Sequence, residues 1–162
     1  MKSYTLITGA SSGLGLDFAK EYAKLGKNLI LVARREERLN ELKKELMVYG
    51  VDILVYRVDL SQTHAIEDFL KNLPSDIFVE RLINNAGFGN HASFDAQAYD
   101  VVSQMTDVNI SAINRLIHAF VPAMKAKKQG EILNVASVAA FTPGPYMAQY
   151  YATKAYVLSL SI

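Results

Sequence analysis

The 162-residue sequence contains no cysteine. This absence excludes disulfide bonds, thiolate metal sites and a thiol nucleophile, and it suits a reducing compartment. The charges nearly cancel, with 17 lysine and arginine residues against 16 aspartate and glutamate residues, so the overall charge favours neither nucleic acid nor an anionic membrane. There is no uncharged apolar run of roughly 18 residues, and the apolar start is too short for a secretory signal. We therefore expect a cytoplasmic protein with no membrane span and no nucleic-acid partner.

The sequence is rich in apolar residues, and their spacing alternates between two periods. A hydrophobic content of 51% is sufficient for a core at a one-domain length. Short β-rich runs alternate with longer segments of helical period, which predicts βαβ units and a parallel sheet. Ser61 is expected to cap the third helix, and Gly130 to end the fourth. The expected strands are 4–8, 28–33, 52–58, 80–84 and 131–137, and the expected helices are 13–26, 36–48, one after Ser61, 97–127 and one from about 149.

The strands of this pattern are apolar almost throughout rather than alternating. Such strands are buried on both faces, so helices must cover both sides of the sheet. Right-handed crossovers then produce a doubly wound α/β sheet, a Rossmann-like arrangement of three layers. In such a sheet the ligand crevice lies at the carboxyl ends of the strands, where the winding reverses.

The stretch "TGASSGLG" joins the first strand to the first helix and carries Gly9, Gly13 and Gly15. A phosphate group needs bare backbone amides and a helix N-terminus, and side chains at these positions would block its approach. The G-x-x-x-G-x-G spacing differs from the G-x-G-x-x-G dinucleotide fingerprint. The alternative interpretation is a tight strand-to-helix turn with Ser12 as the N-cap.

The second strand ends in "LVARREERL", with Ala33 where an acidic residue would bind the ribose hydroxyls of NAD. Arg34 and Arg35 follow, and arginine at this place suits the 2'-phosphate of NADP. The pair therefore favours NADP over NAD. The alternative is a solvated charge cluster that opens a helix, since charged residues continue to position 38.

Near the end of the chain, "YYATK" places Tyr150 four residues before Lys154. Residues at this spacing share one face of a helix, whereas the corresponding partner of Tyr151 is Ala155. A lysine ammonium beside a phenol favours the phenolate, so the pair can act as a general acid or base. The alternative is a surface lysine beside a half-buried tyrosine.

Together these stretches resemble the short-chain dehydrogenase/reductase family, and other pieces match in the same order. "VDL" places Asp59 at the family's adenine contact, "NNAG" follows the fourth strand, and "VNI" places Asn109 at the family's helix asparagine. "VAS" places Ser137 after the fifth strand, 13 residues before Tyr150, a spacing typical of the family. The arginine pair resembles that of members that prefer NADP.

The resemblance implies an NADP(H)-dependent oxidoreductase that moves a hydride between nicotinamide and a carbonyl or alcohol carbon. Tyr150 would be the general acid or base, Ser137 would bind the substrate oxygen, and Lys154 would activate Tyr150 and bind the nicotinamide ribose. Asn109 would anchor a water that links the lysine to solvent. The cofactor-binding residues implied by the resemblance are Gly9, Ser11, Ser12, Gly13, Leu14, Gly15, Arg34, Arg35, Asp59, Leu60, Asn85, Ala86, Gly87, Tyr150 and Lys154.

The resemblance also sets expectations for partners and extent. It implies a small carbonyl or alcohol substrate and a homodimer or homotetramer. It covers the N-terminal two-thirds of a family catalytic domain, so we expect residues 1–162 to form one dinucleotide-binding domain of a longer chain. That domain would lack the C-terminal strands, leave the fifth strand as an exposed edge and be inactive alone. The alternative function is a dinucleotide-binding sensor or interaction protein without turnover.

Other residues give weaker signals. His64, His91 and His118 have no acidic partner at ligand spacing, so we expect no metal site. The two asparagines of "NNAG" could instead pair with backbone in a turn. Six loop residues flank the expected crevice and are candidates for a substrate pocket: Phe88, His91, Phe94, Phe141, Tyr146 and Met147.

Overall fold

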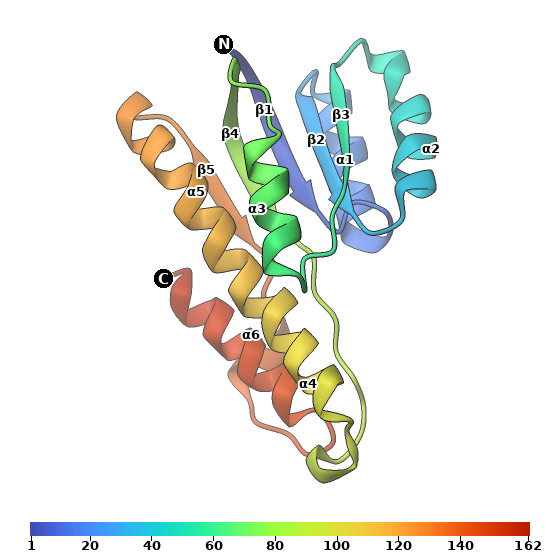
Figure 1. Cartoon of the computed structure of the whole chain (residues 1–162), viewed down its shortest axis with the longest axis vertical. Helices are drawn as coiled ribbons and strands as arrows, with labels where there is room; N and C mark the ends of the chain where they lie inside the picture. Colours follow the sequence, from blue (N-terminus) through green and yellow to red (C-terminus); the bar gives the residue numbers. More distant parts are fainter.

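Five parallel strands form one sheet in the order β3-β2-β1-β4-β5 in the computed structural model, which describes residues Met1–Ile162 (Figure 1). The strands are β1 (Lys2–Thr8), β2 (Asn28–Ala33), β3 (Ile53–Arg57), β4 (Ile77–Asn84) and β5 (Glu131–Asn134). The helices are α1 (Gly13–Lys24), α2 (Glu36–Leu46), α3 (Thr63–Lys71), α4 (Tyr99–Thr106), α5 (Ala112–Lys127) and α6 (Ala148–Leu160). The doubly wound α/β fold predicted from the sequence is confirmed.

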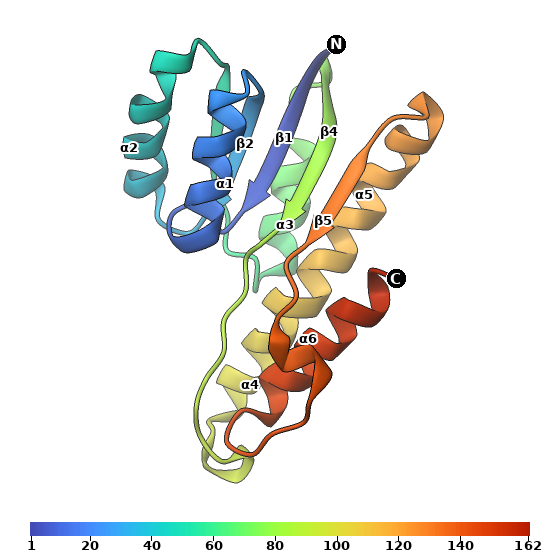
Figure 2. The ribbon, with the colours of Figure 1, turned by 180° about the vertical axis from the view of Figure 1, so that it is seen from behind.

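The winding of the sheet reverses between β1 and β4. The chain moves outward from β1 to β3, crosses back to β4 beside β1, and then moves outward to β5. Helices α1 and α2 cover one face, whereas α3 and α5 cover the other (Figures 1 and 2). Pairing of Thr8 with Val32 and of Ile7 with Ile83 brings the carboxyl ends of three strands to the same edge. A crevice is expected at this edge.

Each face of the sheet has its own apolar core, because successive strand residues point to opposite faces. Leu6 and Leu82 pack towards α3 and α5, whereas Ile7 and Ile83 pack towards α1 and α2. The sequence pattern predicted α2 well, since Leu39, Leu42 and Leu46 are all buried there. Strand β5 differs from the other strands, because it lies at one edge of the sheet and most of its residues are exposed.

Helix α1 fully buries only small residues, and its large apolar residues are divided between the core and solvent. Its buried residues are Gly15, Ala19 and Ala23, whereas the side chains of Leu14 and Leu25 are 59% and 69% exposed. Small residues let the helix approach the sheet closely directly after the tight glycine turn. Phe18 and Tyr22 do pack against the core, so the helical period indicated the helix and part of its buried side.

Several predicted helix ends are wrong by one or two residues, since α1 ends at Lys24, α2 ends at Leu46 and α4 begins at Tyr99. Gln62, rather than Ser61, occupies the N-cap of α3, because the Ser61 hydroxyl donates to Asp59 Oδ1 at 2.8 Å. Helix α5 ends before Lys128, which takes the left-handed conformation (φ 52°) expected of Gly130. Strand β5 also ends at Asn134, three residues before the predicted end at position 137.

Residues 99–127 form the long helix predicted from the sequence, with a wider turn in its middle. The segment Asp107–Ser111 is π-helical and separates α4 from α5. Such turns often occur at functional positions, and this one contains the buried Asn109. Neither this helix nor any other combines the length and the apolar character that spanning a bilayer requires.

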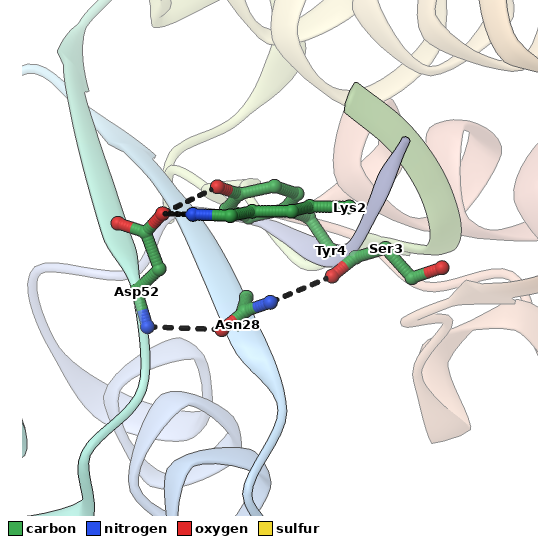
Figure 3. A network of polar contacts seen from close by, with 5 residues as sticks. All are labelled: Lys2, Ser3, Tyr4, Asn28 and Asp52. Carbon is green, nitrogen blue, oxygen red and sulfur yellow. Dashed lines mark hydrogen bonds and ion pairs between the residues drawn. The ribbon is translucent and has the colours of Figure 1, made fainter. Parts of the chain in front are cut away.

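At the amino ends of the strands, polar side chains join β1, β2 and β3 (Figure 3). The Tyr4 hydroxyl donates to Asp52 Oδ2 at 2.7 Å. Asn28 accepts from the Asp52 backbone N–H at 2.9 Å and donates to the Ser3 carbonyl at 3.1 Å. Lys2 Nζ lies 3.1 Å from the same Asp52 oxygen. No sequence motif pointed to this group of residues, which we call the amino-end network.

Candidate active site

A cleft of about 590 Å³ lies at the carboxyl ends of the strands. Its walls come from the segments that follow all five strands, together with α4, the π-helical turn and α6. Of the predicted site residues, only Gly15 and Asn109 do not line it. Those that do are Gly9, Ser11, Ser12, Gly13, Leu14, Arg34, Arg35, Asp59, Leu60, Asn85, Ala86, Gly87, Ser137, Tyr150 and Lys154.

The glycine loop is shaped by steric limits at two positions. Gly13 has a φ of +54°, which side chains rarely adopt, and a Cβ there would meet no atom of the chain within 4 Å. A Cβ on Gly15 would lie 2.3 Å from the Gly9 carbonyl oxygen, so only glycine allows α1 to start this close to the turn. The loop thus leaves open space at the amino end of α1, where backbone amides point outward.

Thr8 and Asn85 brace this loop against the end of β4. The Thr8 hydroxyl accepts from the backbone N–H groups of Asn85 and Ala86, each at 3.0 Å. The Asn85 side chain donates to the Thr8 carbonyl at 3.0 Å, while Asn84 pairs with Asn134 at 2.8 Å. Asn85 thus pairs with backbone, as the alternative interpretation proposed, but with that of Thr8 and Gly9 across the sheet edge rather than within its own turn. Sequence reasoning missed Thr8, although its position directly before the glycine loop was a usable signal.

The two arginines after β2 point to different neighbours in the cleft. Arg35 Nη2 donates to the hydroxyls of Ser12 at 2.8 Å and Ser11 at 3.1 Å. Ser12 is at the N-cap position of α1, but its side chain makes no capping hydrogen bond. Arg34 is close enough to Asp59 to affect its ionisation. The arrangement places cationic groups beside the glycine loop, and both arginines remain exposed to solvent.

Asp59 is held in its ionised form at the end of β3. Burial would raise the pKa of the Asp59 carboxyl, but hydrogen bonds from the Ser61 N–H and hydroxyl, together with the charge of Arg34, lower it overall. The Ser61 N–H donates at 3.0 Å. Asp59 is therefore an acceptor at the edge of the cleft.

Tyr150 and Lys154 face the cleft from neighbouring turns of α6. Lys154 Nζ lies 5.9 Å from the centroid of the Tyr150 ring and donates to the Val135 carbonyl at 2.7 Å. The lysine is only 5% exposed, and this burial lowers the pKa of its ammonium. Tyr151 does not line the cleft and packs instead near Gly144 in a smaller apolar pocket.

Ser137 follows β5 and lines the cleft, and its hydroxyl can still donate a hydrogen bond. Its Oγ accepts from the Ala139 N–H at 3.1 Å and so caps the 3₁₀ turn Val138–Phe141. A hydroxyl that already accepts from the backbone can still donate its own hydrogen. Ser137 can therefore bind an oxygen atom in the cleft.

Asn109 lies behind the cleft rather than in its wall and has no exposed surface. Its Oδ1 accepts from the Phe88 N–H at 3.1 Å. Its Nδ2 donates to the Phe88 carbonyl at 2.9 Å and to Thr153 Oγ1 at 3.0 Å. The amide thus ties the loop after β4 to α6, and the predicted role of Asn109 in holding a water stays a prediction.

Several cleft residues were not among the predicted site residues. Gln104 and Val108 come from the long helix, four positions apart, so helical spacing was the only signal for them. Among the six loop residues proposed for a substrate pocket, only Phe88 lines this cleft. The others missed by the prediction are Ala33, Val58, Ser61, Val135 and Ala136.

The fold and this site define a protein of the dinucleotide-binding α/β class. The family model described as short chain dehydrogenase matches residues 3–161. The chain therefore belongs to the short-chain dehydrogenase family.

Individual relatives agree with this assignment. The chain is 32% identical to the very-long-chain 3-oxoacyl-CoA reductase of Kluyveromyces lactis, covering 98% of this chain and 49% of that protein. It resembles the crystal structure of the bulky-bulky ketone specific alcohol dehydrogenase of Comamonas testosteroni with 36% identity and a TM-score of 0.92, covering 99% of this chain and 65% of the other. The short-chain dehydrogenase of Sphingobium yanoikuyae in complex with NADPH gives the same identity and TM-score over 99% of this chain and 63% of its own. The chain spans about half the length of the curated relatives it matches, 47% and 49% for two of them.

Proposed function

We propose that the protein is an NADP(H)-dependent oxidoreductase that interconverts a carbonyl compound and an alcohol. One observation carries this proposal: a single cleft joins the glycine loop to Ser137, Tyr150 and Lys154. A dinucleotide-binding sensor would need the glycine loop but not a phenol and a hydroxyl at the other end of the cleft.

The cleft fits a phosphorylated dinucleotide at its glycine-loop end. The open space at Gly13 would admit a pyrophosphate to the amides of α1. Arg34 and Arg35 would bind the 2'-phosphate of NADP, and guanidinium groups suit phosphate because they donate several parallel hydrogen bonds. The NADPH complex of the Sphingobium yanoikuyae relative supports this choice of cofactor. When bound, the cofactor supplies or accepts the hydride.

Three residues of the chain would manage the oxygen and the proton. In the direction of reduction, Ser137 donates a hydrogen bond to the carbonyl oxygen and Tyr150 transfers its phenolic proton to it. With a hydride supplied by bound NADPH to the carbonyl carbon, the carbonyl would be reduced to an alcohol and NADPH would be oxidised to NADP. The ammonium of Lys154 favours the phenolate that remains, which later recovers a proton from solvent. Oxidation of an alcohol reverses these steps.

The substrate and the assembly rest on relatives rather than on particular residues. Two similar proteins carry names that specify a ketone and a 3-oxoacyl thioester, both of which contain a carbonyl group. We infer a small-molecule carbonyl or alcohol substrate on this basis. A homodimer or homotetramer is inferred from the family resemblance, and a cytoplasmic location stays a prediction.

The test compares two adjacent tyrosines in the whole protein. NADPH oxidation is followed by absorbance with 2-octanone, 1-phenyl-1,2-propanedione and acetoacetyl-CoA as carbonyl probes. We expect Tyr150→Phe to lower kcat by about a thousandfold, because general acid–base catalysis contributes on this scale. NADPH affinity, measured by fluorescence, should stay within about twofold, since Tyr150 is one contact among many. Tyr151→Phe is the matched control and should turn over normally, whereas equal rates for both variants would contradict the assignment of Tyr150.

A further inference from the structure

The loop after β4 and the loop before α6 are joined by a contact that the proposed chemistry does not use. The Ala92 N–H donates to the Tyr146 carbonyl at 2.8 Å. The His91 ring stacks on the Tyr146 ring with centroids 5.6 Å apart and planes inclined by 17°. We call this contact between residues 91–92 and Tyr146 the clasp. It links the segment after β4 to the segment that enters α6.

Tyr146 adopts a backbone conformation that tyrosine rarely takes. Its φ is 62°, in the left-handed region, which is unfavourable for a residue with a side chain. Such a conformation persists where surrounding contacts impose it. The backbone hydrogen bond and the ring stack of the clasp supply those contacts.

The loop that the clasp holds lies directly against the Tyr150 ring. A Cβ on Gly89 would lie 3.0 Å from Cδ2 and 3.1 Å from Cγ of Tyr150, and 3.1 Å from Cε of Met147. These distances are too short for an ordinary carbon contact, so the bare backbone of Gly89 forms the surface on which the phenol ring rests.

Side-chain hydrogen bonds also hold this loop on both sides of Gly89. The Asn109 amide holds both the N–H and the carbonyl of Phe88, the residue before Gly89. Gln97 Nε2 donates to the Ala92 carbonyl at 3.2 Å. Gly89 therefore lies between two anchored residues, Phe88 and Ala92. The clasp also connects this loop to the segment that leads into α6.

We propose that Gly89, His91 and Tyr146 are positioning residues. Gly89 and the clasp hold the Tyr150 ring in the orientation that proton transfer requires. This inference rests on the proposed function for its catalytic meaning, but the positioning itself does not depend on turnover. Catalysis is sensitive to such placement, since a shift of about 1 Å can cost about a hundredfold in rate.

The first test fills the space at Gly89 and compares it with a matched glycine. Gly89→Ala should displace the Tyr150 ring, whereas Gly144→Ala places a Cβ 2.4 Å from Cε2 of Tyr151, the neighbouring tyrosine outside the cleft. The whole protein is labelled with ring-¹³C tyrosine, and the Tyr150 signal is identified by its loss in Tyr150→Phe. We expect Gly89→Ala to move the Tyr150 signal and Gly144→Ala to move only that of Tyr151.

Turnover should also distinguish Gly89→Ala from Gly144→Ala. We expect Gly89→Ala to lower kcat by about tenfold to a hundredfold, with NADPH affinity unchanged because Gly89 does not line the cleft. A Tyr150 signal that stays in place in Gly89→Ala overturns the proposal, even in an active enzyme. If Gly89→Ala displaces the Tyr150 signal and the wild-type protein itself shows no turnover, the positioning is supported and the proposed function is contradicted.

The second test addresses the clasp and remains usable if Gly89→Ala does not fold. His91→Ala removes the stacked ring, whereas His91→Phe keeps an aromatic ring and removes the imidazole. We expect the Tyr150 signal and kcat to change in His91→Ala and to return towards wild type in His91→Phe. If both variants behave like wild type, or if phenylalanine fails to restore what alanine loses, the stacking part of the proposal is wrong.

Discussion

Polar residues gather at both ends of the sheet, but the two ends use them differently. At the amino ends, Tyr4, Asn28 and Asp52 bind one another and the backbone of β1 and β3 (Figure 3). At the carboxyl ends, the Ser137 hydroxyl retains a free hydrogen, and the Tyr150 hydroxyl has no partner within the chain. The comparison shows that polar groups that satisfy each other stabilise the fold, whereas groups with unused hydrogen-bonding capacity are available to a ligand.

The two ends of the sheet also differ in their effect on the stability of the fold, because Lys154 is buried at the carboxyl end. A buried ammonium with a lowered pKa is less stable in the folded state than in the unfolded state when it is charged. The carboxyl end therefore carries a cost that the amino end does not. Sites of this kind are often made more stable by mutations that remove their function.

The largest effect should come from removing this buried charge. We expect Lys154→Met to lower kcat by about a thousandfold, since the general acid or base loses its neighbouring charge. The free energy of unfolding should rise by about 1 kcal/mol at neutral pH, because the desolvated ammonium is gone. Urea unfolding and NADPH oxidation measure the two quantities.

Lys20→Met is the control for this experiment. Lys20 pairs with Glu45 on the surface, where the two side chains are 34% and 57% exposed. Both quantities should therefore stay close to wild type, within about 0.5 kcal/mol for stability. A Lys154→Met protein that is clearly less stable than wild type would show that its bond to the Val135 carbonyl outweighs desolvation.

The next effect concerns the cofactor end of the cleft. Replacing both Arg34 and Arg35 with alanine should weaken NADPH binding by about a hundredfold, because hydrogen bonds to charged groups contribute about 1.5–3 kcal/mol each. NADH binding should change little, since NADH has no 2'-phosphate. Arg38→Ala is the control, because Arg38 pairs with Glu41 on the outer side of α2. Equal losses for NADPH and NADH would mean that the pair does not read the 2'-phosphate.

The sequence predicted one end of the sheet far better than the other. The carboxyl-end residues were found because their chemistry restricts them to short patterns, such as the glycine loop or Tyr150 with Lys154 at one helical turn. Asp52, Asn28 and Tyr4 come from three strands, and nothing in their local sequence indicates that they meet. Their contacts depend on strand order and register, which appear only once the sheet is assembled.

The misplaced details have similar causes. Helix α1 approaches the sheet through its small buried residues Gly15, Ala19 and Ala23, which the spacing of large apolar residues alone could not reveal. The part played by Asn109 as a brace for Phe88 depends on a loop 21 residues earlier in the chain. Sequence patterns therefore predicted local elements and motif residues, whereas the supports between distant segments required the structure.

A smaller effect is expected from the amino-end network. Tyr4→Phe removes the hydrogen bond to Asp52 and should lower the free energy of unfolding by about 1 kcal/mol. Turnover and NADPH affinity should not change, because the network lies at the opposite end of the strands. Tyr49→Phe is the control, since Tyr49 is 43% exposed and makes no side-chain hydrogen bond. A loss of turnover in Tyr4→Phe at unchanged stability would contradict the division between the two ends.

The smallest effect is the pH dependence of this stabilisation. Hydrogen bonds from Tyr4 and Lys2 lower the pKa of Asp52, so its contribution is present above the usual carboxyl pKa of about 4 and is lost as the pH falls below it. Burial and the bond to Asp52 raise the pKa of Tyr4 to about 12, so its contribution is present below about pH 10 and is lost as the pH rises towards 12. The stability difference between wild type and Tyr4→Phe should therefore be flat from about pH 5 to 9 and shrink on both sides. Lys154 titrates in both proteins and cancels in this difference, so a gap that stayed constant at both extremes would show that the Tyr4–Asp52 bond does not stabilise the fold.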